Sequence, residues 1–207
     1  MTEADEGESH RTEQGYDRFL YFSDAVVAIA ISLLILPVVD AVGDAKAAGD
    51  LTGIEFFADN GGRLLAFAIS FVVIAGFWVG HHRSFEAVTS YTTALVWMNL
   101  LWLATIVFLP LPTEILAVDD GADYGARAIY IGSVFLVSAA NVGLEILVDR
   151  TPAIRRWPDD PRPRLVARLV VPASILVALA LAAIPVIGMW SLLLLAVSGR
   201  IADRNDS

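Results

Sequence analysis

The sequence contains no cysteine among its 207 residues, so disulfide bonds, thiolate chemistry and cysteine-ligated metals are excluded. It also lacks an ordered Ser-His-Asp set, a glycine loop that cradles phosphate and a spaced pair of carboxylates. The net charge of -9 argues against nucleic-acid binding, which needs basic surfaces. We therefore expect neither an enzyme, nor a protein with a bound cofactor, nor a nucleic-acid-binding protein.

Charged residues are also rare inside long apolar blocks. The chain is 57% hydrophobic with a mean hydropathy of +0.65, and its apolar residues form continuous stretches instead of alternating with polar ones. Continuous blocks of this length are typical of membrane-spanning helices. The sequence thus predicts an all-α integral membrane protein with six spans: Phe19–Val39, Arg63–Val79, Ala94–Leu111, Ala126–Val148, Leu165–Ile184 and Val186–Val197.

These spans define one transmembrane domain over residues 18–200, flanked by two tails. The segment Met1–Asp17 is acidic and lacks the basic start of a signal peptide, so we expect a disordered cytoplasmic tail there. Residues 201–207 form the second cytoplasmic tail. The last two spans meet at Pro185 and are expected to form a tight hairpin.

The basic residues fall mainly on one side of the predicted membrane. Eleven of the 14 lie on that side: Arg11, Arg18, Arg83, Arg150, Arg155, Arg156, Arg162, Arg164, Arg168, Arg200 and Arg204. The other side holds Lys46, Arg63 and Arg127. Because lysine and arginine accumulate in cytoplasmic loops, we expect both termini to be cytoplasmic in a multi-pass protein of the cell membrane.

The first span carries Arg18, Ser23 and Asp24 at one end and no further charge before Asp40. An aspartate inside a membrane helix costs about 2.5–3.5 kcal/mol unless it finds partners or water. This helix is therefore where we look for function.

At about 100° per residue, a large aliphatic stripe follows one side of this helix. It consists of Ile29, Leu33 and Leu36, and Asp24 points about 140° away from Ile29. A second stripe of small residues, Ala25, Ala28 and Ser32, suits close helix contact. Either the aliphatic stripe meets lipid and Asp24 anchors the helix end, or the stripe faces a central axis and Asp24 points into its own bundle. Periodicity leaves both open, because the helix is apolar all round.

Three motifs in chain order resemble the family of transmembrane protein 175, a lysosomal potassium channel with many prokaryotic members. They are Arg18-x-x-x-Phe22-Ser23-Asp24, Phe77-Trp78-x-x-His81-His82-x-x-Phe85, and Asn99-Leu-Leu-Trp102 with Leu109-Pro110-x-Pro112-Thr113. The resemblance covers the first three predicted spans.

The resemblance implies six helices per repeat and a pore lined by the first helices around a fourfold axis. One repeat per chain then implies a homotetramer. The family's hydrophobic constriction falls on Ile29, with Leu33 and Leu36 continuing the pore stripe and Ser32 at the hydroxyl position linked to selectivity. An apolar ring restricts ions by the penalty of stripping their water. We therefore expect a passive cation channel that prefers potassium ions modestly over sodium.

The remaining motif residues are expected to hold the first helix in place through a structural polar network. They are Arg18, Phe22, Ser23, Asp24, Trp78, His81, His82 and Asn99. We expect no metal site, because the adjacent His81 and His82 diverge by about 100° on a helix and no third nitrogen is evident. A proton-coupled transporter that uses Asp24 and His81 as a relay is the alternative function.

Overall fold

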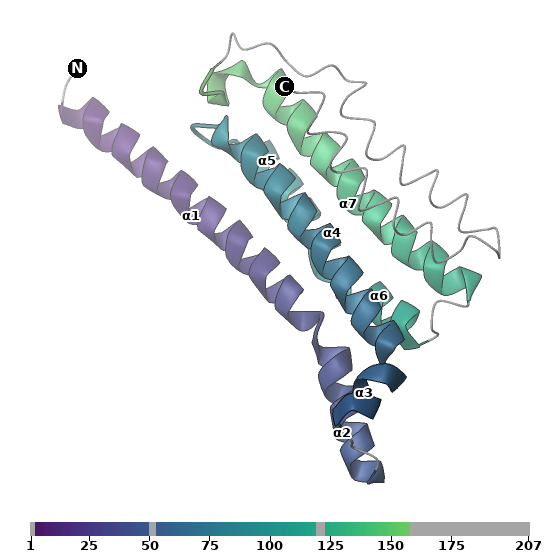
Figure 1. The fold of residues 1–207 in the computed structure, drawn as a ribbon. Coiled ribbons are helices and arrows are strands. Elements are labelled where there is room, and N and C mark those ends of the chain that lie inside the picture. Colours follow the sequence, from purple (N-terminus) through teal and green to yellow (C-terminus); the bar gives the residue numbers. More distant parts are fainter. Residues whose placement is uncertain (1–2, 50–52, 119–122, 158–207) are drawn as a thin grey trace.

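The computed structural model describes residues 3–49, 53–118 and 123–157, with side chains from residue 15 onward. Its helices are α1 (Glu3–Leu33), α2 (Leu36–Ala48), α3 (Gly53–Asp59), α4 (Gly61–Glu86), α5 (Thr93–Phe108), α6 (Pro110–Val118), α7 (Tyr124–Arg150) and the short 3-10 helix η1 (Pro152–Ile154). The long helices run side by side, and α2 and α3 project from one end of the bundle (Figure 1).

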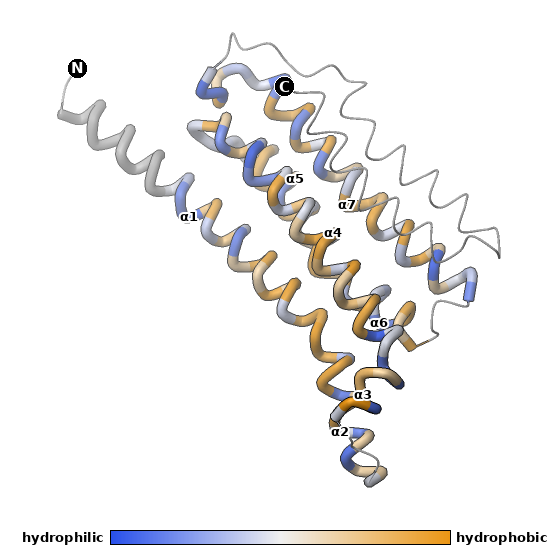
Figure 2. Tube along the Cα trace, in the orientation of Figure 1, coloured by the Kyte–Doolittle hydropathy of each residue, from blue (hydrophilic) through white to orange (hydrophobic). Residues whose placement is uncertain are grey.

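Four helical stretches are long and apolar enough to cross a membrane, judged by length and composition. They are Gly15–Ala48, Gly61–Glu86, Thr93–Val118 and Tyr124–Arg150. Hydrophobic residues fill the middles of these stretches, with more hydrophilic residues toward several of their ends (Figure 2). The first four predicted spans are therefore helical as expected. The predicted spans at 165–184 and 186–197 lie outside the described residues.

The basic residues of the described segments sort to the expected ends. Helix α1 starts, α4 ends, α5 starts and α7 ends at the same end of the bundle (Figure 1). That end carries Arg18, Arg83, Arg150, Arg155 and Arg156, whereas Lys46, Arg63 and Arg127 lie near the opposite end. A β-bridge between Val88 and Arg155 ties the α4–α5 turn to the segment after α7.

The N-terminal segment departs from the prediction. Helix α1 begins at Glu3, so the expectation of a disordered tail through Asp17 is wrong from Glu3 onward. Glutamate, glutamine, alanine and arginine in this segment favour helix. The end of the segment is also anchored, because Tyr16 is buried and its hydroxyl donates to the Phe85 carbonyl at 2.6 Å. An anchored turn supplies the nucleus that a short isolated helix lacks.

Two predicted spans are interrupted by proline. The first is split between α1 and α2 by a turn at Leu34 and Ile35, with Pro37 in the first turn of α2. The third is split between α5 and α6 next to Pro110. Proline lacks the N–H that bonds to the carbonyl four residues earlier, so the regular helix ends there.

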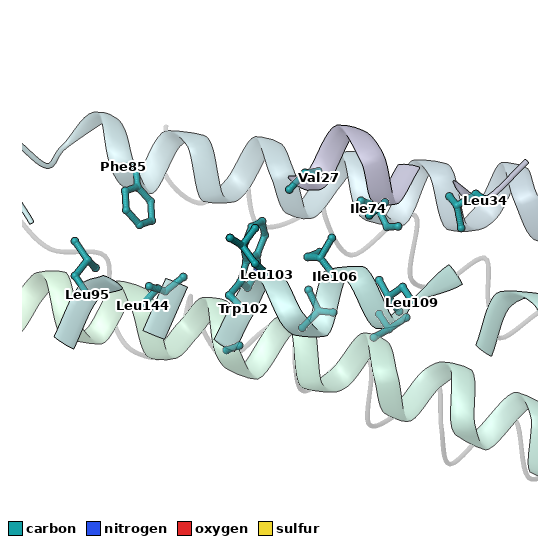
Figure 3. Close-up of a cluster of buried hydrophobic side chains, with 14 of the residues drawn as sticks. Val27, Leu34, Ile74, Phe85, Leu95, Trp102, Leu103, Ile106, Leu109 and Leu144 are labelled. Atoms are coloured by element: carbon teal, nitrogen blue, oxygen red, sulfur yellow. The ribbon is translucent and has the colours of Figure 1, made fainter. Parts of the chain in front are cut away.

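The apolar core lies where α1, α4, α5 and α7 meet (Figure 3). Trp102 of α5 is its largest fully buried side chain, and Val27 of α1 and Leu34 of the turn after it pack into the same cluster. Helix α1 thus packs through a face that also includes Ser23 and Ala30. The small residues that were expected to make close contact, Ala25, Ala28 and Ser32, are exposed in the chain, because this other face carries the larger apolar contacts.

Candidate functional site

The aliphatic stripe of α1 and the start of α2 faces away from the bundle. Ile29 is 60% exposed, Leu33 39% and Leu36 48%. Phe22 is also exposed and lies seven residues before Ile29, as Leu36 lies seven after it. Apolar residues at this repeat form a seam on which other helices can pack. Ser32 lies on the same exposed side, and its hydroxyl donates to the Ala28 carbonyl at 2.8 Å.

Polar side chains on the inward side join α1 to α4 and α5. The Trp78 indole N–H of α4 donates to Asp24 Oδ1 at 2.8 Å. The Asn99 amide of α5 donates to Ser23 Oγ at 2.8 Å, and the Ser23 hydroxyl donates to the Phe19 carbonyl at 3.1 Å. We call Ser23, Asp24, Trp78, His81 and Asn99 the polar anchor.

His81 completes the polar anchor through Asn99. Its Nε2 lies 2.7 Å from Asn99 Oδ1. Because the Asn99 nitrogen already donates to Ser23, its oxygen accepts here, and His81 carries its proton on Nε2. Both Asn99 and His81 are buried, so each of these bonds satisfies a polar group that water does not reach.

Stacked rings fix the His81 side chain. Its ring lies 4.0 Å from Trp102 at 14° and 4.4 Å from Phe85 at 26°. Sequence reasoning missed these contacts and the bond between Tyr16 and Phe85. The sequence held one signal of the contact between His81 and Trp102. Trp102 follows Asn99, the partner of His81, by three residues and therefore lies on the same side of α5.

Three residues of the predicted network lie outside the polar anchor. Arg18 and Phe22 are exposed. They precede Asp24 by six and two residues, which turns them about 120° and 160° away from it. His82 is half-exposed, stacks on Trp78 at 5.5 Å and approaches Glu86 at 3.7 Å. The structure therefore brings together five of the eight residues, with His82 at their edge.

The polar anchor sets the rotation of α1. Bonds to two different helices, from the neighbouring residues Ser23 and Asp24, allow little turning of the helix about its axis. In this orientation Asp24 points into its own bundle while Ile29 points out of it. Asp24 thus points into its own bundle, as in the second of the two arrangements considered from the sequence. The Ile29 stripe is left available to lipid or to other subunits.

Replacing Asp24 separates the role of its oxygen from that of its charge. Asp24→Leu removes the acceptor of the Trp78 indole and is expected to lower the unfolding free energy by about 1–2 kcal/mol. Asp24→Asn keeps Oδ1 and is expected to lose much less. Thermal unfolding in detergent measures both, with Asp40→Leu, at an exposed position on α2, as the control. If asparagine destabilises as much as leucine, the carboxylate charge itself is required.

The polar anchor lies in the part of the chain that matches known proteins. Residues 18–110 match the family model described as endosomal/lysosomal potassium channel TMEM175. A potassium channel of Streptomyces collinus is 38% identical over 122 residues, which are 58% of this chain and 56% of that relative. An endosomal/lysosomal proton channel TMEM175 of Gallus gallus is 37% identical over 103 residues, which are 48% of this chain and 21% of that protein. The chain therefore spans about half the length of the bacterial relative.

A solved structure extends the likeness beyond the matched segment. The crystal structure of a lysosomal potassium-selective channel TMEM175 homolog from Chamaesiphon minutus superposes with a TM-score of 0.72 at 27% identity. The superposition covers 91% of this chain and 97% of the other. Residues 18–110, which contain the polar anchor and the Ile29 stripe, thus match the TMEM175 family model, and most of the chain shares the fold of a TMEM175 homolog.

Proposed function

We propose that this protein is a passive, potassium-conducting cation channel whose pore is lined by α1 and is narrowest at Ile29. One observation carries the proposal: the polar anchor turns Asp24 inward and leaves the apolar stripe of Ile29, Leu33 and Leu36 exposed. The names of the bacterial relatives and of the similar solved structure support potassium as the ion. The family's character as a channel agrees with the expectation that the chain is not an enzyme.

A single exposed stripe cannot enclose a pore, so the proposal requires several copies. We propose a homotetramer with the four α1 helices innermost and the seven-residue seam facing the axis. The arginine-bearing end of the bundle, where α1 starts, is then the cytoplasmic end in the cell membrane.

Ion preference in such a pore follows from dehydration. Four isoleucine side chains offer no oxygen to replace the hydration shell, so an ion passes only by giving up part of its water. Potassium holds its water less tightly than sodium, which favours potassium modestly. The exposed Ser32 hydroxyl lies three residues outward from Ile29 and supplies an oxygen beside the ring.

Proton conduction is the second candidate, because the chicken and human relatives are named proton channels. The relay considered from sequence, Asp24 with His81, receives less support from the geometry. Asp24 accepts from Trp78 and His81 donates to Asn99, so the two groups have separate partners. A coupled transporter must break both bonds in each cycle.

Flux into liposomes tests these functions. With equal pH on both sides, a potassium channel dissipates a potassium gradient, whereas a proton-coupled transporter needs a proton gradient to move potassium. A pH-sensitive dye inside the same liposomes detects proton entry driven by a potassium diffusion potential. If proton entry were detected and no potassium flux occurred under any ionic condition, the permeant ion would be the proton and not potassium.

The tetramer is tested with engineered cysteines, because the chain has none of its own. Ile29→Cys is expected to give disulfide-linked pairs of subunits on oxidation, since four such residues surround one axis. Ile129→Cys on α7 is the matched control, because Ile129 is 49% exposed but lies on another helix. Native mass measurement of the unmodified protein is expected to give four subunits. Monomers or dimers alone, or equal disulfide formation at both sites, would contradict the arrangement.

A further inference from the structure

A cavity of about 590 Å³ lies at the arginine-bearing end of the bundle, and we call it the end cavity. Its walls come from α1, from the end of α4 with the turn that follows, and from the segment after η1. The lining includes Tyr16, Asp17, Glu86, Arg156 and Trp157. Its volume falls within the range of small-molecule sites, roughly 300–1,000 Å³.

Hydrogen bonds hold the walls of the end cavity in place. The Tyr16 hydroxyl donates to the Phe85 carbonyl at 2.6 Å and joins α1 to α4. The Arg156 backbone N–H donates to the Ala87 carbonyl at 2.8 Å and joins the segment after η1 to the turn after α4. Because these bonds form with the fold, a ligand meets walls that are already ordered, and little conformational entropy is lost when it binds.

The end cavity carries charges of both signs on exposed side chains. Asp17 and Glu86 are acidic, and the Arg156 guanidinium lies over the Trp157 ring, 5.6 Å from its centroid. Stacking uses the flat face of a guanidinium and leaves its N–H edge for an oxyanion such as phosphate. His82 Nε2 stays 3.7 Å from Glu86, too far for a hydrogen bond, so this carboxylate can accept from an ammonium group. A ligand with one phosphate and one ammonium group complements all three charges.

The depth of the end cavity in the membrane favours a lipid over a soluble ligand. Glu86 ends the apolar stretch Gly61–Glu86, and Asp17 lies near the start of Gly15–Ala48. The cavity therefore lies where the spans leave the hydrocarbon. Tryptophan and tyrosine gather at the level of lipid headgroups, and Trp157 lines the cavity. A headgroup bound here can keep its acyl chains in the bilayer.

We propose that the end cavity binds the headgroup of phosphatidylethanolamine, with the phosphate at Arg156 and the ammonium group at the carboxylates of Asp17 and Glu86. A primary ammonium group has three N–H donors for these carboxylates. Choline has the same charge but no N–H donor, so the site distinguishes two lipids of equal net charge. The inference goes beyond the proposed function and holds whether or not the protein conducts ions.

Lipid binding to the purified protein in detergent tests the site. Native mass spectrometry, with dioleoyl lipids added stepwise, gives the affinity for each lipid. We expect phosphatidylethanolamine to bind about tenfold more tightly than phosphatidylcholine, which corresponds to one hydrogen bond to a charged group. Equal affinities would overturn the assignment. Glycerophosphoethanolamine lacks acyl chains and is expected to compete poorly; if it bound as tightly as the lipid, the ligand would be a soluble compound and the lipid site would be refuted.

Variants at the exposed side chains locate the binding without disturbing the core. Asp17→Asn combined with Glu86→Gln is expected to abolish the preference for phosphatidylethanolamine, whereas Arg156→Gln is expected to weaken the binding of both lipids about tenfold. Asp40→Asn and Arg150→Gln are the matched controls, because both residues are exposed and lie outside the end cavity. A preference that survived the double variant, or equal losses from Arg150→Gln and Arg156→Gln, would show that the lipid binds elsewhere.

Discussion

Ile29→Asn is expected to raise the potassium current about tenfold, which corresponds to a barrier lower by about 1.4 kcal/mol, and to bring potassium and sodium permeability close together. The reason is that the amide wets the constriction and offers an oxygen where isoleucine offers only methyl groups. Ile29→Ala is expected to act in the same direction by widening the ring. Single-channel recording in a planar bilayer, with potassium on one side and sodium on the other, measures both quantities.

The control for Ile29 must be an isoleucine of similar exposure on another helix. Ile129→Asn on α7 meets this condition, and we expect it to leave the current and the ion preference unchanged. Ile31 is a poorer control, because it packs against the apolar core and its replacement would disturb folding. Equal changes at Ile29 and Ile129, or none at Ile29, would show that α1 does not present this stripe to the ions.

Asn99→Leu is expected to cause the largest loss of stability. Asn99 is fully buried, and its amide serves both Ser23 and His81. Leucine has a similar volume but removes the acceptor of His81 and the donor to Ser23, which keeps only its bond to the Phe19 carbonyl, at a cost of about 1–3 kcal/mol for each buried group. We expect a lower unfolding temperature and less folded protein, as measured by thermal unfolding and gel filtration in detergent.

Asn141→Leu is the matched control for this change. Asn141 is partly buried on α7 and donates to Glu145 of its own helix at 3.0 Å, so the bond that is lost lies within one helix. If both leucine variants are equally stable, the bonds from Asn99 do not hold α1 to α5. A destabilised Asn99→Leu channel that still prefers potassium would fit a structural role for the polar anchor.

The sequence predicted the first four spans and the residues of the polar anchor because long apolar blocks and ordered motifs are local signals. Local signals do not determine the direction in which α1 faces. This helix is apolar all round, so its rotation depends on contacts of Ser23 and Asp24 with residues far along the chain. The buried face through Val27, Ala30 and Leu34 became evident only with α4 and α5 in place.

Several features departed from the prediction for identifiable physical reasons. The acidic segment before Asp17 was expected to be disordered, but it continues a helix whose anchor, Tyr16, bonds to a residue of α4. The first span was expected to be one helix, although Pro37 lay inside it as a visible signal of a break. Phe22 and Arg18 belong to a sequence motif, yet the angles along α1 separate them from Asp24.

The long chain separations within the polar anchor set an order of events during synthesis. Asp24 can form its hydrogen bond only after Trp78, 54 residues later in the chain, has been synthesised. Ser23 can accept its bond only after Asn99, 76 residues later, has been synthesised. A ribosome that adds about 5–20 residues per second needs roughly 4–15 s to make those 76 residues. Throughout this interval the first helix is in or near the membrane without its final partners. Helix α1 therefore precedes α4 and α5 in the chain, but its rotation is fixed only once α5 has emerged.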